Sequence, residues 1–193
     1  MSTRGRVEAA MAARPREWFL PAAVRSQARR DGPLDIGHGQ TNSQPRTVQA
    51  MLELLDVRPG HRVLDVGSGS GWTTAILGEL VGPSGSVLGV ERVPDLVVTG
   101  ARAVAACGMP WAQVRAALPG VLGAPDEAPF DRILVSAMAR ALPGELVAQL
   151  EPHGILVVPV DGRMLRVVRD EDAPEGARVT RHGSYRFVPL VTD

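Results

Sequence analysis

Three glycines separated by serines follow a short apolar run in the stretch from Val63 to Trp72 (VLDVGSGSGW). Glycine lacks a Cβ, so a ligand can approach the backbone closely at Gly67, Gly69 and Gly71. A helix that begins at the end of this loop points its first N–H groups toward that ligand. The residue types and their spacing therefore predict a loop that binds a small molecule. The alternative is a tight strand–helix turn that binds nothing.

An acidic residue favours the binding interpretation. Glu91 ends the next predicted strand, 20 residues after Gly71. In sheets that bind nucleosides, a carboxylate at this place accepts hydrogen bonds from the ribose hydroxyls. The glycines and Glu91 together predict a cofactor that contains adenosine. A carboxylate at a strand end is not expected in the core, so we expect Glu91 to have no role in folding.

Alternating strands and helices are needed to position these residues. Apolar runs bounded by turn residues predict strands, and apolar residues at helical spacing predict helices between them. Such alternation is typical of an α/β protein with a mostly parallel sheet and helices on both faces. The predicted strands cover residues 63–66, 86–91, 114–117, 133–136, 155–160, 165–169 and 186–190, and the predicted helices cover residues 73–80, 96–106 and 145–150.

The beginning of the chain differs from this alternating pattern. Two short helices are predicted within residues 6–30, and residues 32–43 (GPLDIGHGQTNS) are predicted to be extended. Pro45 suits the first turn of a further helix. We therefore expect a single domain over the whole chain, in which residues 1–58 form a helical segment and a lid over a core of residues 59–193.

Composition excludes several other chemistries. Lys and Arg together number 21, and all are arginine, which excludes a P-loop and a Schiff-base enzyme because both need lysine. The chain has one cysteine and four histidines, and these show no ligand spacing, so no metal site is predicted. Basic and acidic residues are both 21 in number. The resulting net charge of zero argues against a nucleic-acid partner.

Length and hydrophobicity indicate the class of protein. A chain of 193 residues suits one compact domain with a full core. No apolar run approaches the roughly 18 residues of a membrane span, and residues 170–177 (DEDAPEGA) are predicted to be a solvated turn. The N-terminus lacks the apolar core of a secretory signal. We therefore expect a cytoplasmic monomer without a membrane partner.

The glycine loop departs from the dinucleotide-binding pattern G-x-G-x-x-G. The third glycine of that pattern admits a pyrophosphate, and Trp72 occupies its position here. Asp65 lies in the strand just before the loop. The pattern (V/L)-L-D-V-G-x-G-x-G resembles motif I of the S-adenosylmethionine-dependent methyltransferases with a Rossmann-like fold, whose cofactor has no pyrophosphate. The resemblance implies S-adenosyl-L-methionine as the cofactor and S-adenosyl-L-homocysteine as its product.

Five further stretches narrow the resemblance. Residues 35–45 (DIGHGQTNSQP) resemble the I-G-(Y/H)-G-Q-T-I-S-Q-P signature of the protein-L-isoaspartate O-methyltransferases, and residues 15–21 (PREWFLP) resemble the P-R-E-x-F-(V/L)-P of that family. Three later stretches match the family in order, namely residues 128–135 (APFDRILV), 150–160 (LEPHGILVVPV) and 187–190 (FVPL). The resemblance implies methyl transfer to the free carboxylate of L-isoaspartyl residues in proteins or peptides, which is a protein-repair reaction.

The resemblance also implies roles for individual residues. Ser43 is the serine of S-Q-P, which in the family lies beside the methyl group and can hydrogen-bond the substrate carboxylate; its alternative role is to start the helix ahead of Pro45. The acceptor carboxylate has a pKa near 4 and is already ionised, so no general base is required. The residues implied to contact the cofactor are Thr41, Asn42, Gly67, Ser68, Gly69, Gly71, Glu91, Arg92 and Gly120.

Two departures from the family pattern keep other functions open. Asn42 stands where the family has isoleucine, and residues 118–120 (LPG) replace a G-D-G whose aspartate meets the adenine amino group. Losing that hydrogen bond costs about 1–3 kcal/mol, unless Asp126 or Glu127 replaces the acid. One alternative is an aspartyl or isoaspartyl methyltransferase that tailors a ribosomally made biosynthetic peptide. Another is a non-catalytic homologue that binds S-adenosylmethionine.

Overall fold

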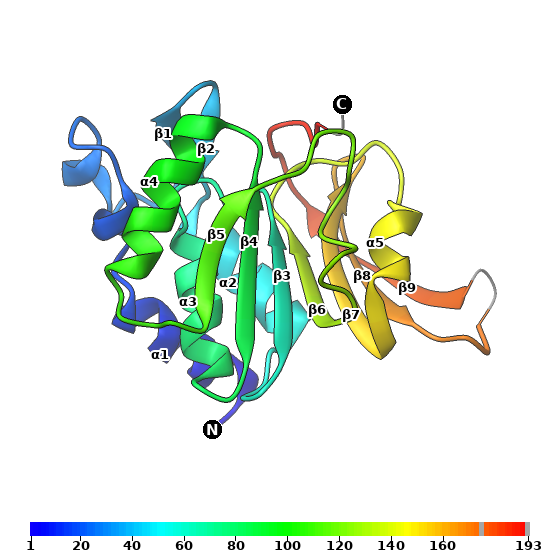
Figure 1. Cartoon of the computed structure of the whole chain (residues 1–193). Helices are drawn as coiled ribbons and strands as arrows, with labels where there is room; N and C mark the ends of the chain where they lie inside the picture. Colours follow the sequence, from blue (N-terminus) through cyan, green and yellow to red (C-terminus); the bar gives the residue numbers. More distant parts are fainter. Residues whose placement is uncertain (174–175, 192–193) are drawn as a thin grey trace.

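The computed structural model describes residues 1–173 and 176–191 and has a seven-stranded sheet at its centre (Figure 1). The strands are β3 (Arg62–Val66), β4 (Ser86–Glu91), β5 (Ala112–Ala116), β6 (Phe130–Val135), β7 (Leu150–Val160), β8 (Arg163–Arg169) and β9 (Ala177–Ser184). Their order is β5-β4-β3-β6-β7-β8-β9. The first five in this order are parallel, and β8 and β9 are antiparallel to their neighbours. The prediction of a mostly parallel sheet is confirmed.

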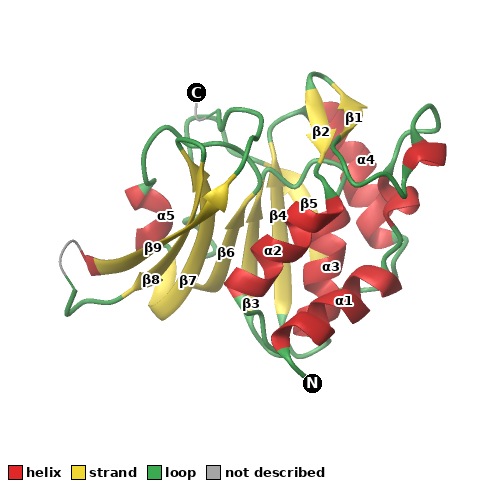
Figure 2. Cartoon of the chain, turned by 180° about the vertical axis from the view of Figure 1, so that it is seen from behind, coloured by secondary structure: helices red, strands yellow, loops and turns green. Residues whose placement is uncertain are grey.

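Helices cover both faces of this sheet, as predicted. They are α1 (Thr3–Ala13), α2 (Pro45–Leu55), α3 (Trp72–Val81), α4 (Pro94–Ala105) and α5 (Gly144–Ala148), with short 3-10 turns η1 (Arg16–Phe19) and η2 (Arg25–Gln27). Helices α1, α2 and α3 pack together on the face that Figure 2 shows, and α4 packs against α3 and β5. Helix α5 lies on the opposite face, against β7.

The core follows from the twofold alternation of side chains along the strands. On the face of α1, α2 and α3, Val63 and Val87 belong to one apolar cluster. On the other face, Leu64 and Leu88 belong to a second cluster, together with the apolar side of α5. Val7 of α1 is 1% exposed and lies in the first cluster. The beginning of the chain therefore shares the core of the sheet.

A small hairpin precedes α2, which the sequence indicated only as an extended segment. Its strands β1 (Leu34–Gly37) and β2 (Gln40–Asn42) pair antiparallel. The turn between them needs positive φ angles at Gly37, His38 and Gly39. Leu34 and Ile36 pack in an apolar cluster that also contains Leu96 of α4. The hairpin is thus held against α4, beside the ends of β4 and β5 (Figure 1).

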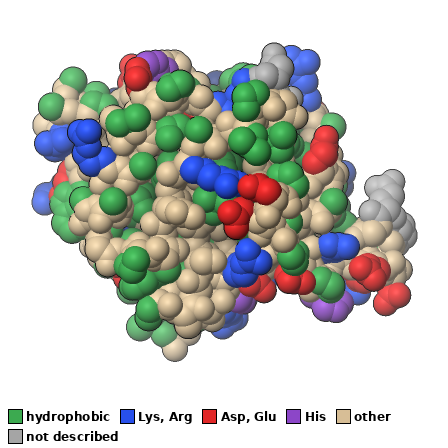
Figure 3. All heavy atoms as spheres, viewed as in Figure 1, with side chains coloured by type: hydrophobic (Ala, Val, Ile, Leu, Met, Phe, Trp, Pro, Cys, Tyr) green, Lys and Arg blue, Asp and Glu red, His purple; other side chains and the backbone are tan. Residues whose placement is uncertain are grey.

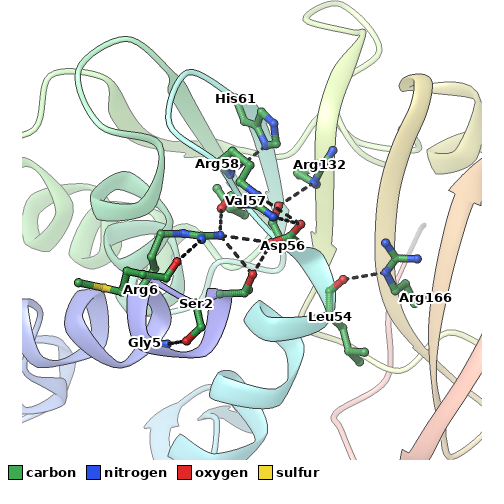
Figure 4. Close-up of polar contacts among 12 residues, drawn as sticks. Ser2, Gly5, Arg6, Leu54, Asp56, Val57, Arg58, His61, Arg132 and Arg166 are labelled. Atoms are coloured by element: carbon green, nitrogen blue, oxygen red, sulfur yellow. Dashed lines mark hydrogen bonds and ion pairs between the residues drawn. The ribbon is translucent and has the colours of Figure 1, made fainter.

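Helix α2 is anchored at its C-terminal end by arginines from three other elements (Figure 4). Arg166 of β8 donates to the carbonyl of Leu54 at 2.9 Å, and Arg132 of β6 donates to the carbonyl of Asp56 at 3.4 Å. Arg6 of α1 reaches the Asp56 carboxylate at 3.2 Å. Carbonyls at a helix C-terminus lack partners within the helix and favour cations. These contacts fix α2, so its opposite end, next to Ser43, has a defined position.

The end of the chain differs from the prediction. Residues 186–190 form no full strand, and only Pro189 makes an isolated bridge, to Met138; a proline has no N–H for a ladder. Strand β9 was missed because its side chains are mostly exposed and polar. The predicted solvated turn at 170–177 lies partly outside the described residues, and its first residue, Asp170, is 5% exposed and pairs with Arg178.

On the face of the molecule in Figure 3, basic and acidic side chains are mixed with one another and with apolar ones, and the described residues form no patch of one charge there. Among the described residues, no helix is long and apolar enough to cross a membrane. The described residues also contain no group of three or more His, Cys, Asp or Glu side chains placed to hold a metal ion.

Candidate active site

A cavity of about 440 Å³ lies at the carboxyl ends of β3 and β4. Parallel α/β sheets bind ligands at this edge, outside the ends of the strands. Five segments supply most of the lining, and they are residues 40–43, 66–70, 90–94, 121–123 and 188–191. The cavity therefore brings the end of the β1–β2 hairpin, the glycine loop and the end of the chain to one place.

The glycine loop turns sharply from β3 into α3. Gly67, Gly69 and Gly71 have φ angles of 77°, 53° and 85°, which side chains other than glycine rarely adopt. Gly67 and Gly69 line the cavity, whereas Gly71 does not. A Cβ at Gly71 would lie 2.8 Å from the side chain of Val104 in α4. Gly71 is thus required for helix packing, and the predicted cofactor contact at this residue is not supported.

Glu91 lies beneath this loop and lines the cavity. Its Oε2 accepts a hydrogen bond from the Gly69 N–H at 2.8 Å, and its Oε1 accepts from the N–H groups of Arg92 at 2.7 Å and Val93 at 2.9 Å. The residue is 8% exposed. The expectation that Glu91 has no role in folding is therefore wrong, because its carboxylate holds the glycine loop to the end of β4. A carboxylate has about four acceptor positions, so Oε2 keeps one for a ligand.

Two further polar side chains are buried beside Glu91. Asp65 is fully buried, and its Oδ2 accepts a hydrogen bond from Thr74 Oγ1 at 2.7 Å. Its Oδ1 and the hydroxyl of Ser68 make no hydrogen bond within the described structure. Burial raises the pKa of Asp65 to about 7; the bond from Thr74 opposes this shift, and the charge of Glu91 adds to it. Asp65 is consequently an acid whose protonation changes near neutral pH.

The segment after β2 forms the opposite wall. Thr41, Asn42 and Ser43 all line the cavity, as predicted, and Asn42 is 5% exposed. Helix α2 has Gln44 as its N-cap, and no side chain caps the helix through a hydrogen bond. The alternative structural role of Ser43, as a helix-capping residue, is thus not used. Its hydroxyl makes no hydrogen bond among the described residues and remains available to a ligand.

Arg16 does not line the cavity but holds the segment of Asn42 and Ser43 that does, a role that the sequence did not predict. It is 4% exposed and donates to the side chain of Asn42 and to the backbone carbonyls of Gly32 and Ser43. Its guanidinium also lies 5.5 Å from the centre of the Trp72 ring. Burial lowers the pKa of Arg16. A lone arginine in a short helical turn is normally read as exposed, and its partners lie up to 27 positions away in the sequence.

Comparison with known proteins decides the family. The family described as Protein-L-isoaspartate(D-aspartate) O-methyltransferase (PCMT) matches residues 1–193. The chain belongs to this family. A relative from Methanopyrus kandleri named protein-L-isoaspartate O-methyltransferase is 44% identical over 190 residues, covering 96% of this chain and 83% of the relative. A relative of the same name from Methanothrix thermoacetophila is also 44% identical, covering 96% of this chain and 88% of its own length.

Solved structures agree with this membership. A structure from Plasmodium falciparum, described as a protein-L-isoaspartate O-methyltransferase in complex with S-adenosyl-L-homocysteine, is 26% identical to this chain with a TM-score of 0.83. The match covers 97% of this chain and 91% of that one. The predicted Rossmann-like methyltransferase fold is confirmed, and the chain is a member of a family of S-adenosylmethionine-dependent protein carboxyl methyltransferases.

The wall beyond Glu91 departs from the PCMT pattern. Arg92 lines the cavity, but Gly120 does not, and a Cβ on Gly120 would meet nothing within 4 Å. The predicted contact between Gly120 and the cofactor is therefore not supported. Asp126 accepts two bonds from Arg115, at 2.9 and 3.0 Å, and Glu127 lies 3.6 Å from the same guanidinium. Neither acid lines the cavity, so neither replaces the aspartate of G-D-G.

Proposed function

We propose that this chain transfers a methyl group from S-adenosyl-L-methionine to the free carboxylate of L-isoaspartyl residues in proteins or peptides. One observation carries the proposal: the uncommitted Ser43 hydroxyl and the glycine loop face the same cavity. Membership of the PCMT family and relatives of that name at 44% identity support the same reaction. The methyl ester closes to a succinimide without further catalysis, so the reaction is a step of protein repair.

The cavity suits S-adenosyl-L-methionine in size and in polar groups. Its volume of about 440 Å³ falls within the roughly 300–1,000 Å³ of small-molecule sites. The remaining acceptor position on Glu91 Oε2 would take a ribose hydroxyl. The backbone of Gly67 leaves room for the ligand, because a Cβ there would touch nothing closer than 4.0 Å. The N-terminus of α3 favours the carboxylate of the methionine part.

The reaction requires that the acceptor carboxylate be positioned against the methyl group, and it requires no proton transfer. When bound, the cofactor supplies a methyl group on a sulfonium, which an ionised carboxylate takes directly. Ser43 would donate a hydrogen bond to one carboxylate oxygen and leave the other facing the methyl group. His38 is the only histidine among the described lining residues, and its Nε2 lies 3.2 Å from Asp95. The site would therefore orient the acceptor carboxylate and shield it with residues 188–191, and it would not use a general base.

The two parts of the chain contribute different residues to the site. Residues 1–58 carry Ser43 and the hairpin, and residues 59–193 carry the glycine loop and Glu91. We infer that the first part serves as the lid and acceptor wall, and the second as the cofactor-binding core. A protein or peptide substrate would approach between the hairpin and residues 188–191. The cytoplasmic location and the monomeric state stay predictions.

Two alternatives remain to be separated from repair. The replacement of isoleucine by Asn42 suggested a dedicated peptide substrate, but its amide is committed to Arg16 and Ser70 and does not by itself favour one. The uncommitted Ser43 hydroxyl favours catalysis over cofactor binding alone. Activity on an aspartyl peptide, with none on isoaspartyl peptides, would indicate the biosynthetic function. Cofactor binding without any methyl transfer would indicate the non-catalytic homologue.

Replacement of Ser43 tests the proposed function. One neutral hydrogen bond to the carboxylate is worth about 1–2 kcal/mol, so Ser43→Ala should transfer labelled methyl to an isoaspartyl peptide roughly 5–30-fold more slowly. Its affinity for S-adenosyl-L-homocysteine should be unchanged. Ser84→Ala is the matched control, because Ser84 is exposed and lies in the turn before β4, at the other end of that strand. Full activity of Ser43→Ala would remove Ser43 from the mechanism.

A further inference from the structure

Asn42 connects two parts of the site that the reaction must bring together. Its Oδ1 accepts a hydrogen bond from Arg16 Nε at 2.6 Å, and its Nδ2 donates to Ser70 Oγ at 3.1 Å. Arginine has no acceptor atom, so the amide must turn its oxygen toward Arg16 and its NH₂ toward Ser70. The orientation of the Asn42 side chain is thereby settled. It joins the segment that carries Ser43 to the loop that faces the cofactor.

Arg16 holds the other side of this connection. Its Nη2 donates to the carbonyls of Asn42 at 3.0 Å and Ser43 at 2.9 Å, and also to the carbonyl of Gly32. Its Nη1 donates to the carbonyl of Arg30 at 2.9 Å. The guanidinium fork matches several acceptors at fixed angles, which a lysine ammonium does not. Arg16 therefore fixes the backbone at Ser43 and presents the Asn42 amide to the glycine loop.

The isoleucine of the family pattern could not make this connection, because its side chain has no donor or acceptor. In this chain a buried polar link replaces an apolar contact at that position. Ser70 lines the cavity and accepts from Asn42, so its own O–H stays free to donate elsewhere. Ligand binding at the glycine loop and the position of the Ser43 segment are consequently joined through one side chain.

We propose that Asn42 is a positioning residue that, together with Arg16 and Ser70, locks the Ser43 segment to the cofactor loop. The lock sets the distance between the acceptor carboxylate and the methyl group, and it does not contact either of them. It therefore acts on the rate of transfer and not on substrate affinity. The inference concerns the same site as the proposed function and rests on that function for its kinetic part.

The kinetic test compares Asn42→Ala, Ser70→Ala and the double variant. One hydrogen bond links the two residues, so each single variant should lower kcat on an isoaspartyl peptide by about 3- to 10-fold, with KM unchanged. The double variant should be no slower than the slower single variant, because the same bond is lost only once. Arg46→Ala is the control, because Arg46 follows Ser43 closely and its side chain makes only an exposed ion pair with Asp31 among the described residues. The kcat of this variant should equal that of the wild type.

A second readout does not depend on activity. Hydrogen exchange of residues 38–46 is measured at saturating S-adenosyl-L-homocysteine, where every variant is fully bound. The lock predicts that exchange in this segment is about 3- to 10-fold faster in both single variants and no faster in the double variant. The proposal would be overturned if the effects of the two single variants on kcat and on the exchange rate multiplied in the double variant. It would also be overturned if Asn42→Ala had the kcat and exchange rate of the wild type. A wild type that methylates no isoaspartyl peptide would refute the proposed function, while the exchange data would still decide the lock.

Discussion

The buried carboxyl of Asp65 should make the stability of the fold depend on pH. In the folded protein its pKa is raised to about 7 by burial, with a smaller rise from the charge of Glu91. In the unfolded chain the pKa is near its ordinary value of about 3.9. Between these two values the folded state holds a proton that the unfolded state lacks. The contribution to stability is therefore full below the unfolded pKa and is lost as the pH rises through about 7.

The size of the stability change follows from the pH range over which Asp65 is protonated only in the folded state. One proton of difference is worth about 1.4 kcal/mol for each pH unit. Between pH 5 and pH 8, Asp65 stays protonated in the folded state over about two units, so its contribution falls by about 2–3 kcal/mol. Asp65→Asn removes the titration but keeps the shape of the side chain and an oxygen that can accept from Thr74. The stability of this variant should lack that part of the pH dependence.

Urea unfolding at several pH values between 5 and 8 measures the effect. The free energy of unfolding of Asp65→Asn, minus that of the wild type, should rise by about 2–3 kcal/mol across this range. Subtraction cancels groups that titrate alike in both proteins. Asp126→Asn is the control, because Arg115 holds the pKa of Asp126 below its ordinary value, so its difference from the wild type should stay constant. A constant difference for Asp65→Asn as well would show that Asp65 is not a buried, protonated acid.

Three further predictions concern Glu91, Gly71 and the adenine end of the cofactor. Glu91→Ala should weaken binding of S-adenosyl-L-homocysteine by roughly 1–3 kcal/mol, as titration calorimetry measures. It should also lower the Tm in thermal unfolding, since three backbone N–H groups lose their acceptor. An unchanged affinity and Tm would contradict this role of Glu91. Gly71→Ala should lower the free energy of unfolding in urea by more than about 1 kcal/mol, because the new Cβ would lie 2.8 Å from the side chain of Val104. An unchanged free energy of unfolding would show that the contact with α4 does not require glycine. An S-adenosyl-L-homocysteine analogue with hydrogen in place of the adenine amino group should bind within about threefold of the parent, and a loss above about tenfold would reveal an acceptor at that end.

The strongest sequence signals were those of the parallel sheet. The apolar runs at Ser86–Glu91 and Ile155–Val160 predicted strands because both faces of a covered sheet are buried. The edge strand β9 gave no such signal, since its exposed side chains alternate without an apolar face. Residues 186–190 gave a false signal because Val188, Pro189 and Leu190 line the cavity and Phe187 packs against the core, with an isolated bridge at Pro189 in place of a strand.

The site was predictable where backbone geometry demands a residue type. Gly67 and Gly69 were predicted from their spacing, whereas Ser43 was predicted only through the family resemblance, and all three line the cavity. Gly71 shows the same pattern for a different reason, contact with α4, which a sequence alone does not distinguish. Arg16 stood out in the sequence only as part of the motif PREWFLP, and its role was not predictable, because it depends on carbonyl groups from segments that only the fold brings together.

A competition between two peptides measures whether the protein prefers isoaspartyl residues as methyl acceptors. The peptides share one sequence and differ only in an L-isoaspartyl or an L-aspartyl residue, with an isotope label elsewhere to tell them apart. They are mixed in equal amounts with the wild-type protein and S-adenosyl-L-methionine, and mass spectrometry follows methyl ester and succinimide. We expect that the isoaspartyl peptide alone gains a methyl group and then yields succinimide. Methylation of the aspartyl peptide alone, or of neither peptide by protein that binds the cofactor, would contradict it.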